Sequence, residues 1–198
     1  RELERPGLLA DSRQRLLRSL HQVWQAELEQ LRWARFQQLQ GRTQWLVAGS
    51  VFASPLASVD LLVVAVANGL MIREMASNWG CTAKIELLQE AAGQLARVAL
   101  AQGVVEWTGQ TLLGLAKLDG GSWLVAGSMQ ALSAAYLTRV VGRSMADWLA
   151  LSAGVTEPDL NELRQRAPLL VAKAAEQERL DWNLFLQDSH RWLLQATS

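Results

Sequence analysis

Apolar side chains recur at intervals of three and four residues over residues 12–40, a segment without proline or glycine. This spacing places them on one face and predicts a single long amphipathic helix. The apolar positions are Leu16, Leu17, Leu20, Val23, Trp24, Leu28, Leu31 and Ala34. Two interpretations are open. The helix is an arm that contacts a neighbouring domain or, as the commoner arrangement, an outer helix whose apolar face covers the core.

A second pattern follows over residues 43–72, where Asp60 is the single formally charged residue. Pro55 lies near the middle, and proline disfavours helical backbone in the residue before it. The stretch is therefore predicted to be a helical hairpin, with one segment ending near Ser54 and another over residues 58–78. Gly80 is suited to end the second helix, because glycine readily adopts the left-handed conformation found after helix ends.

The rest of the chain also has helical periodicity and predicts helices over residues 83–100, 104–118 and 123–151, with Gly120 and Gly121 as a break. Thr156 and the residues up to Asp159 resemble a capping box with an early proline, which opens a terminal helix. Pro168 is expected to restart or kink this helix. The closing part of this helix is predicted to be amphipathic. Its apolar side is predicted to carry Leu169, Leu170, Ala174, Leu180, Leu184, Phe185 and Trp192. Its polar side is predicted to carry Glu176, Glu178, Arg179 and Asp188.

These segments predict an all-α fold, a helical bundle with a long N-terminal amphipathic helix and a central hydrophobic helical hairpin. Leu, Ala, Gln, Glu and Arg dominate the sequence, and all of them favour helix. The expected organisation is a helical arm over residues 1–42, a helical core over 43–152, and polar C-terminal helices over 153–198 that pack on the same domain.

Composition excludes several classes of function. Lys plus Arg and Asp plus Glu each number 19, so the net charge is zero and nucleic acid is not expected as a partner. Cys81, His21 and His190 are too few for a disulfide framework or a closed zinc site, and no cofactor is expected. No secretory signal pattern opens the chain, which favours a cytosol-facing protein. Its start at Arg1 suggests a processed protein or an excised domain.

A hexapeptide, WLVAGS, occurs twice, at residues 45–50 and 123–128. Each copy has a glycine four residues before an alanine, Gly49 before Ala53 and Gly127 before Ala131. Pairs of small residues at this spacing allow two helix backbones to approach closely. Gly49 and Gly127 are therefore predicted to lie at matched packing surfaces.

The search for catalytic chemistry gives no convergent site. None of the three lysines follows a glycine, so no phosphate-binding loop can be drawn. Asp188 and His190 flank a serine, but neighbouring residues on a helix point to different sides and cannot act as a triad. Asp60 and Asn68 are polar residues in the most apolar segment. Asp60 is expected to stabilise the first turn of its helix, and Asn68 and Arg139 are expected to be hydrogen-bonded packing residues. An enzyme is not expected.

The hairpin also raises the question of a membrane. Residues 56–72 would span about 25 Å as a helix, whereas a hydrocarbon core is about 30 Å thick. Arginines precede the hairpin, and Arg73 follows it, so both ends favour the same, cytoplasmic, side. A shallow re-entrant hairpin, or a hairpin buried in a helical core, fits better than a single span.

Spaced small and polar residues resemble those of the YcjF-like domain of unknown function. They are Gln44, Trp45, Leu46, Ala48, Gly49, Pro55, Asp60, Leu61, Leu62, Asn68, Met71, the segment SAAYLTR over 133–139, and Gly142. The resemblance covers about residues 35–148. Trp79 stands where an aromatic, commonly Tyr, is expected.

The resemblance implies an all-α, membrane-associated module that follows, or is encoded beside, an Era-like or dynamin-like GTPase domain in cyanobacteria and proteobacteria. The leading hypothesis is a non-catalytic module that positions a GTPase domain, in cis or in trans, at the cytoplasmic face of a plasma or thylakoid membrane. The alternative is a soluble helical protein-interaction or regulatory domain that binds a GTPase or self-associates as a homo-oligomer. Candidate structural or interface residues are Asp60, Asn68, Arg73, Arg139, Gly49 and Gly127.

Overall fold

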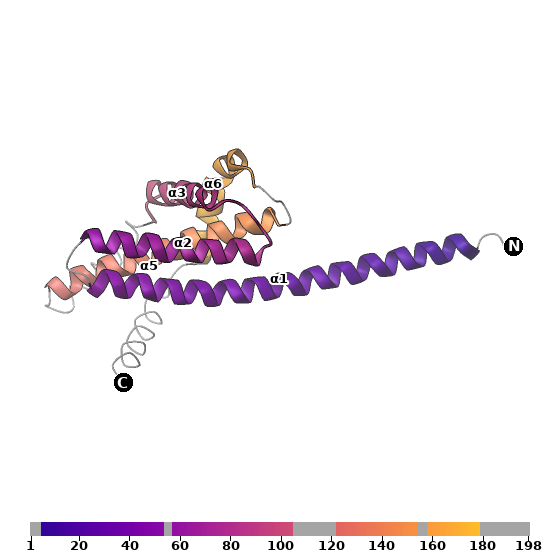
Figure 1. Ribbon diagram of the computed structural model, residues 1–198, viewed down its shortest axis with the longest axis horizontal. Helices are drawn as coiled ribbons and strands as arrows, with labels where there is room; N and C mark the ends of the chain where they lie inside the picture. Colours follow the sequence, from indigo (N-terminus) through magenta and orange to yellow (C-terminus); the bar gives the residue numbers. More distant parts are fainter. Residues whose placement is uncertain (1–4, 54–56, 105–121, 154–157, 179–198) are drawn as a thin grey trace, which may run out of the picture. The chain divides into compact units, whose positions relative to one another are not determined.

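The computed structural model describes residues 5–53, 57–104, 122–153 and 158–178; for 5–10, 52–53, 57–65, 122–130 and 132 it describes the backbone only. In this part of the chain there are five helices and no strand (Figure 1). The helices are α1 (Arg5–Ala53), α2 (Ala57–Asn78), α3 (Ile85–Ala101), α5 (Ser122–Leu151) and α6 (Leu160–Gln177). The predicted all-α bundle with a long N-terminal helix is confirmed.

The chain divides into two compact units, Arg1–Gln38 and Leu39–Ser198. Helix α1 contributes residues to both, because it continues without interruption through Gly41. The expected arm helix and the first helix of the hairpin are therefore one element. A glycine inside a helix costs only about 1 kcal/mol relative to alanine, which is too little to end a helix with good helix formers on both sides.

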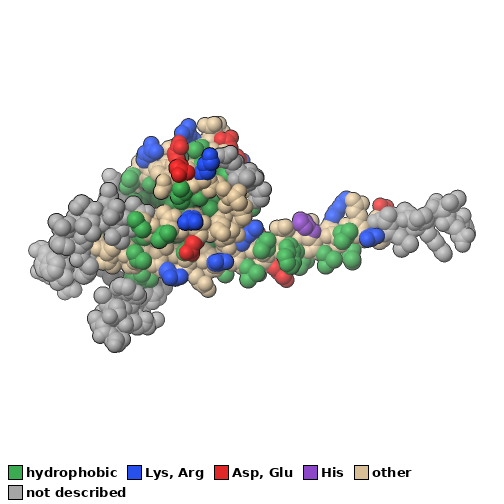
Figure 2. Space-filling view, in the orientation of Figure 1, with side chains coloured by type: hydrophobic (Ala, Val, Ile, Leu, Met, Phe, Trp, Pro, Cys, Tyr) green, Lys and Arg blue, Asp and Glu red, His purple; other side chains and the backbone are tan. Residues whose placement is uncertain are grey.

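In the first unit, residues 11–38 of α1, here called the arm, leave six large apolar side chains in solvent, whereas Phe36 near the end of the arm is 1% exposed. Leu16, Leu17, Leu20, Val23, Trp24 and Leu31 are 56–69% exposed. Hydrophobic side chains follow one another along the arm in Figure 2. The interpretation of this helix as an outer helix that covers the core stays a prediction.

In the second unit, here called the bundle, the described helices pack around α5. Helix α5 contacts α2, α3 and α6, while α3 also contacts α2 and α6. The side chains that are 2% exposed or less include aromatic and aliphatic residues and methionines: Met71, Met75, Trp79, Leu88, Leu95, Val140, Met145, Trp148, Leu149, Leu163 and Val171. Burial of these side chains is the main stabilising contribution to the bundle.

Helix α2 ends as predicted at Gly80. Its φ of 70° is left-handed, which glycine adopts at no steric cost. The N–H of Gly80 donates to the carbonyl of Ser77 at 3.1 Å, and that of Cys81 donates to the carbonyl of Ala76 at 2.8 Å. This pair of bonds is the Schellman motif, and Ala76 and Cys81 are both buried beside it.

Helix α6 differs in three details from the expectation. It begins at Leu160, where the Asp159 carboxylate caps it by accepting a 2.8 Å bond from the N–H of Asn161. It also runs through Pro168 without a restart, whereas a kink at this residue stays a prediction. Leu169, predicted on the apolar side, is 74% exposed, whereas Glu178, predicted on the polar side, is buried. Leu170 and Ala174 are buried and Glu176 is exposed, as predicted. Glu178 departs from the prediction because it caps the end of the helix and its carboxylate pairs with Arg139 on α5.

Some predictions lie outside the described residues. These are the helix over 104–118 apart from its first residue, the break at Gly120 and Gly121, the capping residues Thr156 and Glu157, and the predicted side chains Arg179, Leu180, Leu184, Phe185, Asp188, His190 and Trp192.

Candidate functional site

The charged group best anchored in the bundle is Arg139 on α5. Its Nε donates to Glu178 Oε2 at 2.9 Å, and its second terminal nitrogen lies 2.7 Å from the same oxygen. The other terminal nitrogen donates to Gln44 Oε1 at 3.0 Å. The side chain of Glu178 is 7% exposed and that of Arg139 is 26% exposed. One guanidinium therefore joins α5 to α1 and to the end of α6.

Neighbouring polar bonds reinforce this junction. The Gln40 side-chain amide donates to the backbone carbonyl of Arg139 at 3.0 Å, and the Tyr136 hydroxyl donates to the carbonyl of Ala175 at 3.0 Å. Glu178 is the C-cap of α6, where the helix dipole disfavours a carboxylate. Arg139 supplies the positive charge that offsets this, so the two residues depend on each other.

A second charged cluster lies further along α5. The Asp147 carboxylate, with its side chain 8% exposed, lies 3.6 Å from Arg143 Nε and 3.1 Å from Lys173 Nζ. Asp147 is buried although it carries a charge. Both clusters connect helices of the bundle, and both have the character of structural ion pairs with oppositely charged partners.

Three helices of the bundle come close together at Gly142. A Cβ atom at this position would lie 3.1 Å from Met71 Cε on α2 and 3.9 Å from Gln40 Nε2 on α1. Helices α1, α2 and α5 therefore meet at this glycine. A small residue at a close helix approach was expected at Gly49 and Gly127; Gly49 is half-buried, and position 127 lies outside the residues whose surroundings are described.

The remaining predicted residues do not converge. Asn68 on α2 is half-buried, and its Oδ1 accepts no hydrogen bond from the described residues. Arg73 is exposed on the same helix. Asp60 lies in the first turn of α2, but its side chain is outside the described part. Of the six candidates, Arg139 alone is shown at the centre of a polar network.

Sequence reasoning missed the partners of Arg139. Gln44 was noted only in the resemblance, Glu178 was placed on the polar face of α6, and Gln40 was not singled out. The available signal was a lone arginine after a long uncharged stretch of α5, which requires a buried acceptor. That signal predicts a partner without saying which one, because Gln44 is 95 residues away and Glu178 is 39 residues away.

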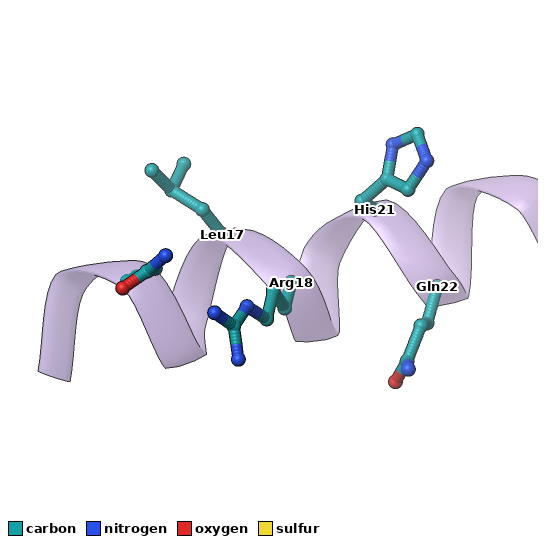
Figure 3. A pocket seen from close by; sticks show the side chains of 5 residues that line it. Leu17, Arg18, His21 and Gln22 are labelled. Carbon is teal, nitrogen blue, oxygen red and sulfur yellow. The ribbon is translucent and has the colours of Figure 1, made fainter. Parts of the chain in front are cut away.

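A small-molecule or metal site requires several side chains that converge on one point. Among the described residues, no three His, Cys, Asp or Glu side chains gather as a metal site. A shallow hollow of about 360 Å³ on the arm is lined by Gln14, Leu17, Arg18, His21 and Gln22. Leu17 and His21 extend from one side of the ribbon and Arg18 and Gln22 from another, so the hollow is a groove between side-chain rows of a single helix (Figure 3). It has no wall from a second element that could enclose a ligand.

The comparison with known families decides the identity. Residues 15–176 match the family model of a domain of unknown function, DUF697, which covers most of the chain. The chain belongs to the DUF697 family. No curated protein and no solved structure matches it. DUF697 membership supports the expected assignment to a domain family of unknown function.

The DUF697 match includes most of the arm as well as α2, α3 and α5 and nearly all of α6. All the residues of the Arg139 junction except Glu178 lie within it. Across the described residues of this DUF697 chain, no helix is both long and apolar enough to cross a membrane.

Proposed function

We propose that this chain is a non-catalytic helical module that holds a GTPase domain, in cis or in trans, at the cytoplasmic face of a membrane through shallow contact of the hairpin over residues 45–72. The support for a GTPase is the resemblance to domains that accompany GTPases. The support for a lipid contact comes from the surface of the hairpin itself.

The observation that carries the proposal is a set of large apolar side chains left in solvent on the hairpin. Leu46, Val66 and Leu70 are 55%, 55% and 59% exposed. Val66 and Leu70 are one helical turn apart and therefore share a face of α2. The guanidinium groups of Arg42 and Arg73 are exposed at the ends of this segment, and basic groups next to apolar ones attract anionic lipid headgroups.

A second candidate function rests on a different observation. Val47, Met71, Ile72 and Met75 belong to the same hairpin segment or follow it directly, and all are buried. The hairpin then serves as the core of a helical protein-interaction module, and the arm provides the contact with a GTPase or with a second copy of the chain.

Flotation with lipid vesicles distinguishes the membrane module from the protein-interaction module. The purified chain is mixed with vesicles of phosphatidylcholine alone or with added phosphatidylserine. We expect flotation with the anionic vesicles and its loss in the double variant Leu46→Ser with Leu70→Ser. Burial of a leucine contributes about 1.5–3 kcal/mol, so removal of two should lower the bound fraction more than tenfold.

The matched control is the double variant Leu151→Ser with Leu169→Ser, whose two leucines are 62% and 74% exposed on α5 and α6. It should float like the parent chain. A parent chain that stays in the soluble fraction with both vesicle types would contradict the membrane proposal and favour the interaction module.

A further inference from the structure

The arm presents an apolar face that its own unit does not cover. Its six exposed large apolar residues fall within residues 16–31, and Leu28 beside them is half-exposed. At about 100° per residue, these seven side chains occupy an arc of about 140°. A continuous apolar patch of this kind marks a protein interaction surface, whereas isolated exposed leucines do not.

The spacing within this face is suited to packing against another helix. Leu17, Leu20, Trp24, Leu28 and Leu31 follow one another at intervals of three, four, four and three residues. Leu17 and Leu28, and likewise Leu20 and Leu31, are eleven residues apart. An eleven-residue period keeps side chains close to one line along an almost straight helix, so the face runs along the arm without winding around it.

Two charged residues lie within this apolar arc, and their positions indicate which kind of surface can pair with it. Within residues 13–31, Arg13 and Glu27 are the charged residues that fall inside the arc, and both are exposed. Arg13 precedes Leu20 by seven residues, and Glu27 follows it by seven. The face therefore has a positive end, a leucine centre and a negative end, all at nearly the same angle around the helix.

We propose that this face pairs with the same face of a second copy of the chain in antiparallel orientation, with Leu20 at the two-fold axis. Arg13 then lies opposite the partner's Glu27 at both ends of the paired segment. The same register brings Leu16 against the partner's Trp24, and Leu17 against the partner's Val23. The surface is self-complementary, as a two-fold interface requires.

Charge excludes the parallel alternative. Two parallel arms in register would bring Arg13 against Arg13 and Glu27 against Glu27, and a charged or polar residue within an apolar seam is the usual determinant of helix orientation. The paired segment, residues 13–27, is about 21 Å long and lies wholly within the first unit. A segment of this length predicts a small interface and therefore a dimer that forms reversibly.

Charge reversal tests the register. Sedimentation velocity of the full chain over a range of concentrations should show a monomer that converts to a dimer. Arg13→Glu and Glu27→Arg should each raise the dissociation constant by about tenfold or more, because each replaces two attractive contacts by two repulsive ones. The double variant Arg13→Glu with Glu27→Arg restores both pairs and should dimerise like the parent. Arg18→Glu is the control, since Arg18 lies two residues from Leu20 and faces away from it.

Three outcomes would overturn the proposal. They are a chain that remains monomeric up to millimolar concentration, a dimer insensitive to both single reversals, and a double variant no stronger than the single ones. The first would assign the face to a different occupant, such as a GTPase domain or lipid. These measurements contain neither lipid nor GTPase, so their outcome is independent of the proposed membrane role; the dimer specifies the second-copy contact of the interaction module.

Discussion

Two stretches of the same helix, α1, behave in opposite ways. In the arm, Leu20 and Trp24 are more than half exposed, whereas Val47 and Ala48 in the bundle are buried. The helical backbone is continuous between them, and apolar residues follow helical periodicity in both. Periodicity therefore identifies the apolar face of a helix, but the tertiary partner decides whether water reaches that face.

The polar contacts of the two units differ in the same way. In the arm they are local, as in the ion pair of Arg32 with Glu29, three residues apart. In the bundle they join distant parts of the chain, as Arg139 does with Glu178 and Gln44. Local pairs stabilise a helix in any surroundings, whereas long-range pairs fix one arrangement of helices. The long-range contacts of the bundle fix its tertiary structure, whereas the local contacts of the arm stabilise only the helix itself.

The largest effect should come from cavity formation in the bundle. Leu95→Ala on α3 removes a fully buried side chain and should lower the free energy of unfolding by about 3 kcal/mol. Leu31→Ala removes the same atoms from a side chain that is 69% exposed, and should change the free energy of unfolding by less than about 0.5 kcal/mol. Urea unfolding followed by circular dichroism measures both, at a protein concentration low enough to keep the chain monomeric. Equal losses in the two variants would show that the arm face is covered within the monomer.

A smaller effect is expected at the Arg139 junction. Glu178→Gln keeps the shape of the side chain but removes the charge that faces Arg139, and should cost about 2 kcal/mol, because the guanidinium loses its buried partner while staying partly solvated. The matched control is Glu162→Gln, whose pair with Arg166 is half exposed on both sides and should cost less than about 0.5 kcal/mol. Thermal melts of the two variants provide the comparison. If Glu178→Gln melts like the parent, the junction does not hold the helices together.

Much of the helical content could be predicted from local signals. The end of α2 at Gly80 follows from the backbone freedom of glycine, and the Pro55 signal separated α1 from α2. The segments predicted over residues 12–40 and from residue 43 belong to one helix, because the glycine between them, Gly41, is a weak signal within a strong helical context. Pro168 likewise did not end α6, whose buried residues Leu163, Leu170 and Ala174 pack on both sides of it.

The candidate site was less predictable. Arg139 was recognisable as a lone charge after a long uncharged stretch, but nothing local indicates that Glu178 leaves the polar face of α6 to meet it. The exposure of the arm was unpredictable for a related reason, because the same amphipathic pattern is typical of a helix that covers its own core and of one that binds another chain.

The most direct test of the difference between arm and bundle is amide hydrogen exchange of the full chain at low and high protein concentration. Amides over residues 16–31 should exchange rapidly in the dilute sample and several times more slowly in the concentrated one, because pairing protects the helix. Amides around Leu95 and Leu149 in the bundle should be strongly protected at both concentrations. Arm amides whose exchange rates do not depend on concentration would contradict the account, since the apolar face would then have no second copy to bind.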